Sequence, residues 1–168
     1  DTNIETSVDL PASLHAGLGW QTSDRVWMEF DLSWTEWSSY DSLTVTYDEL
    51  MGSTSAVSSM PKLWEDAMAY RLGVSYAVSP NWVARLGYAY DESPIPDETR
   101  DPSLPGANRH DISMGVGYDT GRWGLDAGYL QVRFEDTVSE LSSPANGELS
   151  GDYQGTAHVF GVSTTVRF

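Results

Sequence analysis

The sequence predicts an all-β protein: an antiparallel transmembrane β-barrel, of which about seven strands, or eight, are present. Apolar side chains recur at every second residue in one segment after another, the pattern of strands with two different faces. Fifteen Gly, seven Trp and nine Tyr occur among 168 residues, yet the mean hydropathy is only −0.36, as expected for a barrel with a polar interior. Short and long polar connections alternate along the chain, like the turns and loops of outer-membrane barrels.

Each predicted strand carries one apolar row. The first is the loosest, with Leu14, Leu18 and Trp20 in its row. The other rows are Val26, Met28, Phe30, Leu32 and Trp34; Met68, Tyr70, Leu72, Val74, Tyr76 and Val78; Trp82, Ala84, Leu86, Tyr88 and Tyr90; Ile112, Met114, Val116 and Tyr118; and Phe160, Val162, Val166 and Phe168.

Two stretches depart from this simple pattern. From Trp123 the apolar positions are odd, and at Leu130 they become even, which we interpret as a bulge near Tyr129. The stretch 25–49 is long for one strand and could fold back near Tyr40, which would give the eighth strand.

The connections have two lengths. Residues 22–24, 79–81 and 120–122 have the composition of hairpin turns, whereas residues 52–63, 92–109 and 140–151 are long and polar. We expect the short turns on the periplasmic side and the long loops outside the cell.

The apolar rows are expected to face lipid. The opposite rows hold Gly, Ala and Ser with scattered Arg and Asp, and the chain has one Lys, unlike a water-exposed strand surface. Aromatic residues gather toward segment ends, as in interfacial girdles, and the chain ends on Phe168 in phase with the apolar row. A soluble lipid-binding barrel would bury the same rows. We favour the bacterial outer membrane.

Charge and composition exclude several functions. Acidic residues outnumber basic ones 25 to 9, giving a net charge of −16, which argues against nucleic-acid binding. Without Cys the chain has no disulfide or thiolate site, and its three His are too scattered to bind a metal. We therefore expect no enzyme, no metal and no cofactor.

Several motifs bear a family resemblance. A Leu-Pro pair precedes the Gly-rich first segment (8–20), Trp-Ser follows an acidic strand (31–43), and Tyr-x-Tyr-Asp-x-Ser-Pro-x-Pro (88–96) precedes Leu-Pro-x-x-x-Arg (104–109). Over nearly the whole chain the sequence resembles the C-terminal half of FadL/TodX-type outer-membrane transporters of long-chain fatty acids and hydrophobic compounds. It departs at Gly106, where the family usually has Asp.

The resemblance implies a fourteen-stranded barrel with an N-terminal hatch. Residues 1–168 would then be a single barrel segment without the hatch and early strands, and the missing N-terminal half of the barrel would be a partner.

The resemblance also suggests where a ligand would bind. In the lumen, Arg71 or Arg85 would anchor a fatty-acid carboxylate beside Glu29 and Asp31, unless these charges pair with one another. In the long loops, the residues expected to capture the ligand, or merely to pack together, are Met60, Leu63, Trp64 and Leu104.

The expected function is passive uptake of long-chain fatty acids or other hydrophobic compounds across the outer membrane. Outer-membrane lipid and lipopolysaccharide would be its surroundings. The alternative is a small closed barrel with a structural or adhesive role and a packed interior.

Overall fold

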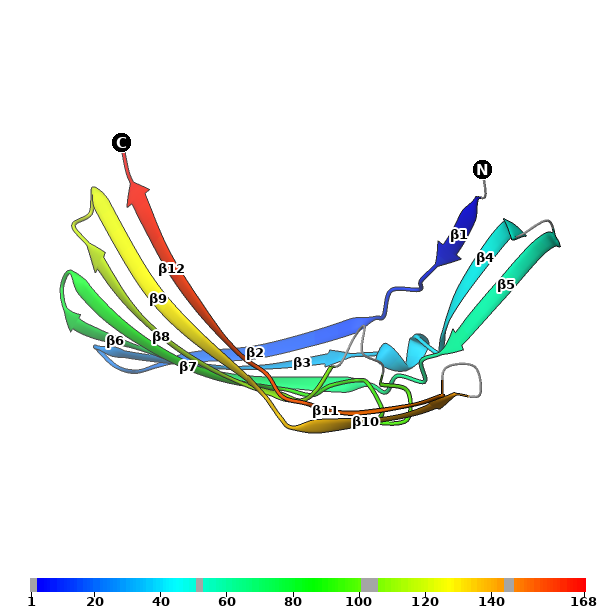
Figure 1. Ribbon diagram of the computed structural model, residues 1–168. Coiled ribbons are helices and arrows are strands. Elements are labelled where there is room, and N and C mark those ends of the chain that lie inside the picture. The colour runs from blue at the N-terminus through cyan, green and yellow to red at the C-terminus, as the bar shows by residue number, and fades with distance from the viewer. Residues whose placement is uncertain (1–2, 51–52, 101–105, 144–146) are drawn as a thin grey trace.

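The computed structural model describes residues 3–50, 53–100, 106–143 and 147–168. Its main feature is one curved antiparallel sheet of seven strands in the order β12-β9-β8-β7-β6-β3-β2 (Figure 1). Its strands are β2 (Ser13–Ser23), β3 (Val26–Thr35), β6 (Ala67–Ser79), β7 (Trp82–Asp91), β8 (Arg109–Asp119), β9 (Trp123–Phe134) and β12 (Thr156–Val166). These are the seven segments that the alternation predicts.

Two hairpins extend from one end of this sheet. β4 (Ser42–Leu50) pairs with β5 (Ser53–Pro61) and with the short β1 (Ile4–Ser7), and β10 (Thr137–Ser143) pairs with β11 (Gly147–Tyr153). Two of the three predicted long loops therefore contain strands of hairpins: 52–63 contains β5, and 140–151 contains parts of β10 and β11. The chain does not fold back beside β3 after Tyr40, so the main sheet has no eighth strand among the described residues.

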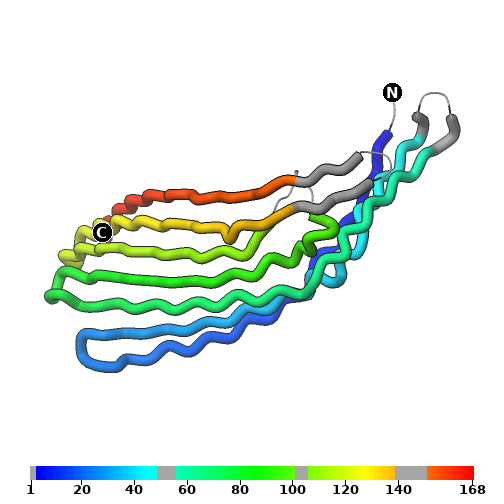
Figure 2. The backbone as a smooth tube through the Cα atoms, turned by 60° about the horizontal axis from the view of Figure 1, so that its bottom comes forward, coloured from blue at the N-terminus to red at the C-terminus, as the bar shows by residue number. Residues whose placement is uncertain are grey.

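The two ends of the sheet differ. The tight turns β2–β3, β6–β7 and β8–β9 lie together at one end, with the C-terminus (Figure 2). We call this the turn end, and the opposite end, with the two hairpins and the segment 92–108, the loop end. Helical structure in the described residues is a single 3-10 turn, Trp37–Ser39, and none of their helices could cross a membrane.

The two faces of the sheet carry the two predicted rows. The apolar row, including Phe30, Leu72 and Val116, is exposed. The opposite row lines an open hollow of about 810 Å3, into which Arg71 and Arg85 come from neighbouring strands. We call these the outer and the inner face.

The predicted bulge near Tyr129 is wrong. Tyr129 lies opposite Met114 and Phe160 without a break in register on either side. Leu130, Val132 and Phe134 therefore face inward, and the apparent change of phase marks an apolar patch on the inner face. Real register shifts occur only beside turns, between Gln21 and Ser23 and between Ala77 and Ser79, within the described pairings.

The sheet does not close on itself. Among the described residues, β12 pairs only with β9, and β2 only with β3. The predicted alternative of a small closed barrel is thus not what these residues form.

Candidate functional site

The candidate site is a pocket of about 490 Å3 at the loop end of the inner face. Its floor is polar and comes from strands, with Ser33, Arg71 and Arg109 as its central residues. Its walls are apolar and come mainly from the loop segments, with Trp37, Trp64 and Ile95 among them. Asp91 and Glu92 also line the pocket, which thus combines charged groups of both signs with an apolar surface, a lining that suits an amphipathic ligand.

Arg71 differs from the other arginines of the inner face. Its Nη1 donates a hydrogen bond to Ser33 Oγ at 2.8 Å, and the same Oγ lies 2.8 Å from His15 Nδ1. Asp31 is its register partner on β3, yet Arg71 forms no ion pair with any described residue. Its guanidinium therefore keeps donors for a carboxylate from outside the sheet.

Arg109 is paired with a carboxylate, but one of its N–H groups has no hydrogen-bond partner among the described residues. It pairs with Asp91 at 2.6 Å, and its Nε is 3.7 Å from Asp111 Oδ2. That Nε and Asp111 Oδ1 are buried without a hydrogen-bond partner among the described residues. Because such groups are costly to leave unsatisfied, they mark a place for a ligand or ordered water.

The aromatic wall is built around Trp64. Its ring meets Trp37 edge-on, with centroids 5.1 Å apart, and Tyr40 at 4.9 Å. The indole Nε1 is buried and has no hydrogen-bond partner among the described residues. Asp66 Oδ1 accepts the N–H of Ser38, the residue after Trp37, at 3.1 Å. This hydrogen bond helps to hold Trp37 against Trp64.

Hydrogen bonding holds the Asp66 carboxyl in its charged form. The side chain and then the backbone N–H of Ser38 lower the pKa of Asp66 from its ordinary value of 3.8. Asp66 lies just before β6, outside the strands of the main sheet.

Arg100 fixes the opposite wall. It is only 4% exposed and donates to the carbonyls of Ile95 (2.9 Å), Gly106 (2.9 Å) and Val138 (3.0 Å), besides pairing with Asp97. Ile95 and Gly106 line the pocket, so one buried side chain joins this wall to β10. Sequence reasoning missed Arg100, because nothing in a Pro-rich acidic segment marks one arginine as buried.

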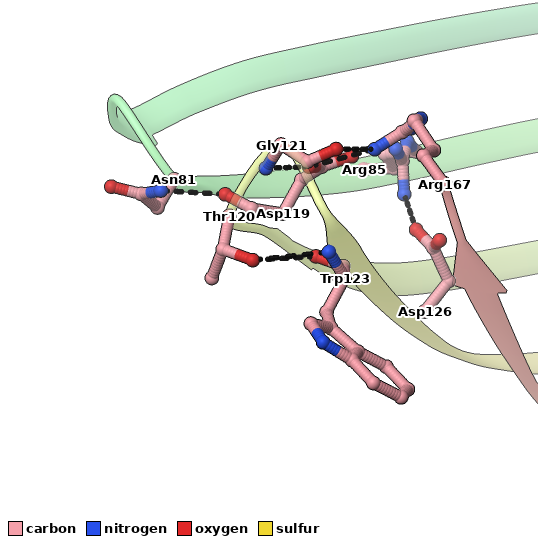
Figure 3. Close-up of polar contacts among 8 residues, drawn as sticks. All are labelled: Asn81, Arg85, Asp119, Thr120, Gly121, Trp123, Asp126 and Arg167. Carbon is pink, nitrogen blue, oxygen red and sulfur yellow. Dashed lines mark hydrogen bonds and ion pairs between the residues drawn. The ribbon is translucent and has the colours of Figure 1, made fainter.

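Two arginines near the turn end are paired with carboxylates. Arg85 binds Asp126 at 2.8 Å and Arg167 binds Asp119 at 2.9 Å (Figure 3). Arg167 Nη1 also donates to the Gly121 carbonyl, while Asn81 Nδ2 donates to that of Asp119. This cluster holds the turns together, and its cations are already neutralised.

The comparisons with known proteins identify the chain. The family model described as "Outer membrane protein transport protein (OMPP1/FadL/TodX)" matches residues 2–168. The chain belongs to this family. It is a family of outer-membrane transport proteins, and the FadL/TodX-type chain described here is an outer-membrane protein.

Individual relatives agree with this assignment. The FadL/TodX-type chain is 33% identical to the long-chain fatty acid transport protein of Escherichia coli K12 over 60% of its own length and 22% of that protein. It is 26% identical to a putative outer membrane protein of Neisseria meningitidis over 94% of its length and 36% of that protein.

A solved structure confirms the fold. A FadL homologue of Pseudomonas aeruginosa matches with a TM-score of 0.85 and 28% identity, covering 97% of this chain and 37% of that one. The FadL/TodX-type chain therefore spans between about a fifth and two fifths of the length of these relatives.

The predicted site residues fall into three groups. Arg71 and Trp64 both line the pocket, whereas Glu29, Asp31 and Arg85 line only the adjoining hollow, which Arg71 borders as well. Met60 and Leu63 are 49% and 54% exposed and do not line the pocket. Leu104 lies outside the described residues.

Other pocket residues were not predicted. His15 and Ser33 were recognised only as inner-row residues, and Trp37 only as part of a motif. Ser33 could have been predicted as a site residue, because the alternation places it on the same face as Asp31, two residues away.

Proposed function

We propose that this chain is the C-terminal part of an outer-membrane channel for passive uptake of long-chain fatty acids or other hydrophobic compounds. The pocket at the loop end receives the head group of a fatty acid, with the carboxylate on Arg71. The apolar wall around Trp64 and Ile95 holds the first part of the tail.

The observation that carries this proposal is that Arg71 has no carboxylate partner among the described residues. Arg85, Arg109 and Arg167 each have a carboxylate partner, but Arg71 has only the Ser33 hydroxyl among the described residues. A fatty-acid carboxylate can bind there without breaking an existing ion pair. Because Ser33 holds the guanidinium in place, less side-chain entropy is lost on binding.

The exposed residues of the loop end have an earlier role in the same proposal. Met60 and Leu63 present exposed apolar surface in the segment that leads to the wall residue Trp64, and they make the first contact with the ligand. Leu104 is proposed for the same role from the sequence alone. Glu29, Asp31 and Arg85 give the hollow a polar wall, along which the ligand is released.

The test uses the full-length protein that contains this chain, with Arg71→Gln as the central variant. Binding of palmitate and of the neutral hydrocarbon hexadecane is measured by isothermal titration in detergent. Loss of a charge-assisted pair should weaken palmitate binding by roughly tenfold or more and leave hexadecane binding unchanged. Arg167→Gln is the control, since it removes an arginine at the turn end that is already paired with Asp119 and has no proposed contact with the ligand.

Equal palmitate affinity for Arg71→Gln and wild type would refute the role of Arg71. An equal loss for palmitate and hexadecane would show that the substitution damages the pocket rather than a carboxylate site. Fatty-acid uptake by cells expressing each variant then tests whether the channel as a whole performs the proposed transport.

A further inference from the structure

The outer face becomes polar near the loop end. On β6 and β7 this level carries Tyr70 and Tyr90, which are register partners. Continuing along the same row, Tyr90 lies opposite His110, and His110 opposite Arg133. The next row toward the turn end places Gln131 opposite His158. We call His110, Gln131, Arg133 and His158 the polar sector.

The polar sector is unusual for this chain. The net charge is −16, with nine Lys and Arg and three His in total, yet two of the His and one Arg meet here. Arg71, Arg85 and Arg109 face inward, so Arg133 is the one Arg or Lys that the described strands place on the outer face. An arginine facing lipid costs roughly 2–4 kcal/mol at mid-membrane and much less at the interface, where it can meet head groups.

Arg133 is also unpaired within the described part of the chain. It forms no hydrogen bond or ion pair with any described residue, although Glu135 is two residues away. Both oxygens of Glu135 are engaged, Oε1 by His110 Nε2 at 3.0 Å and Oε2 by Asn108 Nδ2 at 3.0 Å. The nearest acidic group in sequence is therefore held by other donors, and the exposed Arg133 remains available.

A concave surface accompanies these groups. A depression of about 580 Å3 lies among Tyr88, His110, Gln131 and Arg133, and the acidic residues Glu135 and Asp136 line it as well. Beside it, the Tyr129 hydroxyl lies 2.7 Å from His158 Nδ1, and in the tautomer in which that hydroxyl donates to Nδ1, His158 Nε2 carries a hydrogen that it can donate. Toward the turn end the outer face is strongly apolar, with Phe160 78% exposed.

We propose that the polar sector binds a phosphate of lipopolysaccharide, the phosphorylated glycolipid of the outer leaflet. Arg133 supplies the paired guanidinium donors that match a phosphate, and Gln131 and His158 Nε2 add neutral or protonated donors. The apolar surface around Phe160 contacts the acyl chains of the same molecule. A lipid rather than a free anion is the occupant, because the donors lie on the face that meets the membrane, directly above that apolar surface.

The experiment uses full-length protein, freed of lipid and refolded in detergent. Binding of bisphosphorylated lipid A is compared with binding of the same lipid lacking its phosphates, and inorganic phosphate is tested as a competitor. Arg133→Gln should weaken binding of the phosphorylated lipid by roughly tenfold, and Arg133→Lys by less, since it keeps the charge and loses the paired geometry. Arg122→Gln is the matched control, because Arg122 is an exposed arginine at the turn end.

The proposal holds if Arg133→Gln binds weakly, Arg122→Gln binds like wild type, and removal of the phosphates abolishes the difference. It fails if Arg133→Gln keeps wild-type affinity, or if both glutamine variants lose affinity equally. Displacement of the lipid by millimolar inorganic phosphate would overturn the lipid assignment in favour of a small-anion site. His158→Phe provides a second variant with the same expected direction, and heat-modified migration on gels verifies that each variant is folded.

Discussion

At the scale of single residues, Gly117 shows how the inner face accommodates its charges. Arg85 on β7 and Asp126 on β9 are separated by β8, and their 2.8 Å ion pair crosses it. Gly117 on β8 lies under this pair, opposite Val83 and Asp126. A Cβ at Gly117 would lie 2.5 Å from Asp126 Oδ1 and 3.0 Å from Arg85 Nη1. The ion pair therefore depends on the absence of a side chain there.

Gly117→Ala is expected to displace the Arg85–Asp126 pair and to destabilise the full-length protein. The cost should be on the order of 1–3 kcal/mol, as for other overpacked sites. It is measured as a lower urea midpoint for unfolding from lipid vesicles. Gly128→Ala is the control, since a Cβ there meets only Met114 O at an ordinary 3.7 Å. Equal midpoints for the two variants would contradict this account of Gly117.

The sequence predicts which face a charged side chain lies on, but not which partner it binds. The alternation correctly placed Arg71 and Arg85 on the same face as Glu29 and Asp31. It could not show that Arg71 would bind Ser33 while Arg85 reached past a strand to Asp126. The partner that a side chain binds depends on distances between residues of different strands, and the alternation along one strand gives no information about them.

At the scale of elements, the strands of the main sheet were predictable because each has one face against lipid. Such strands must keep an apolar row for their whole length, so the period is easy to recognise. The β4–β5 and β10–β11 hairpins were missed because they extend beyond this sheet and carry many Ser and Thr. β4 has a short apolar row, Leu43, Val45 and Tyr47, but its partner β5 has no matching row, so the hairpin is not marked by a pair of alternating segments.

The 3-10 turn that carries Trp37 is expected to depend on pH. Asp66 accepts the Ser38 N–H, and its pKa in the folded protein lies below its ordinary value of 3.8. A carboxylate with a lowered pKa stabilises the fold fully above its unfolded pKa, and this contribution is lost as pH falls through the folded value. Below that pH the turn should detach and the contact between Trp37 and Trp64 should loosen.

Amide hydrogen exchange in a peptide covering residues 36–41 measures this effect. Protection, corrected for intrinsic exchange rates, should be constant at neutral pH and should fall in the acid range. Asp66→Asn should remove the dependence and lower protection at every pH, while Asp24→Asn, in the β2–β3 turn, should leave it as in wild type. A wild-type profile that is flat down to pH 2 would show that the turn is held by packing alone. A pH dependence that persists unchanged in Asp66→Asn would show that a group other than Asp66 causes it.

At the scale of the whole molecule, the most consequential feature is that both edges of the main sheet are open in the described part of the chain. β2 and β12 each leave one side without a strand partner among the described residues, and the outer face is apolar from the turn end up to the polar sector. Unpaired backbone groups are not tolerated in hydrocarbon, so transmembrane sheets close into barrels. The chain covers 37% of the Pseudomonas aeruginosa FadL homologue. We propose that further strands of the same barrel close both edges and that a hatch precedes them.

This proposal predicts how residues 1–168 behave when they are produced alone. Refolded in detergent, they should form dimers or larger assemblies through β2 and β12, because exposed edge strands pair with other chains. The full-length protein in the same detergent should be a monomer that resists unfolding in cold sodium dodecyl sulfate. Native mass spectrometry gives the mass of each species, and replacing Val162 on β12 by Pro should weaken the assembly of the short chain by removing an edge donor. A stable monomer of residues 1–168 that migrates as a folded barrel would mean that seven strands close without further sequence.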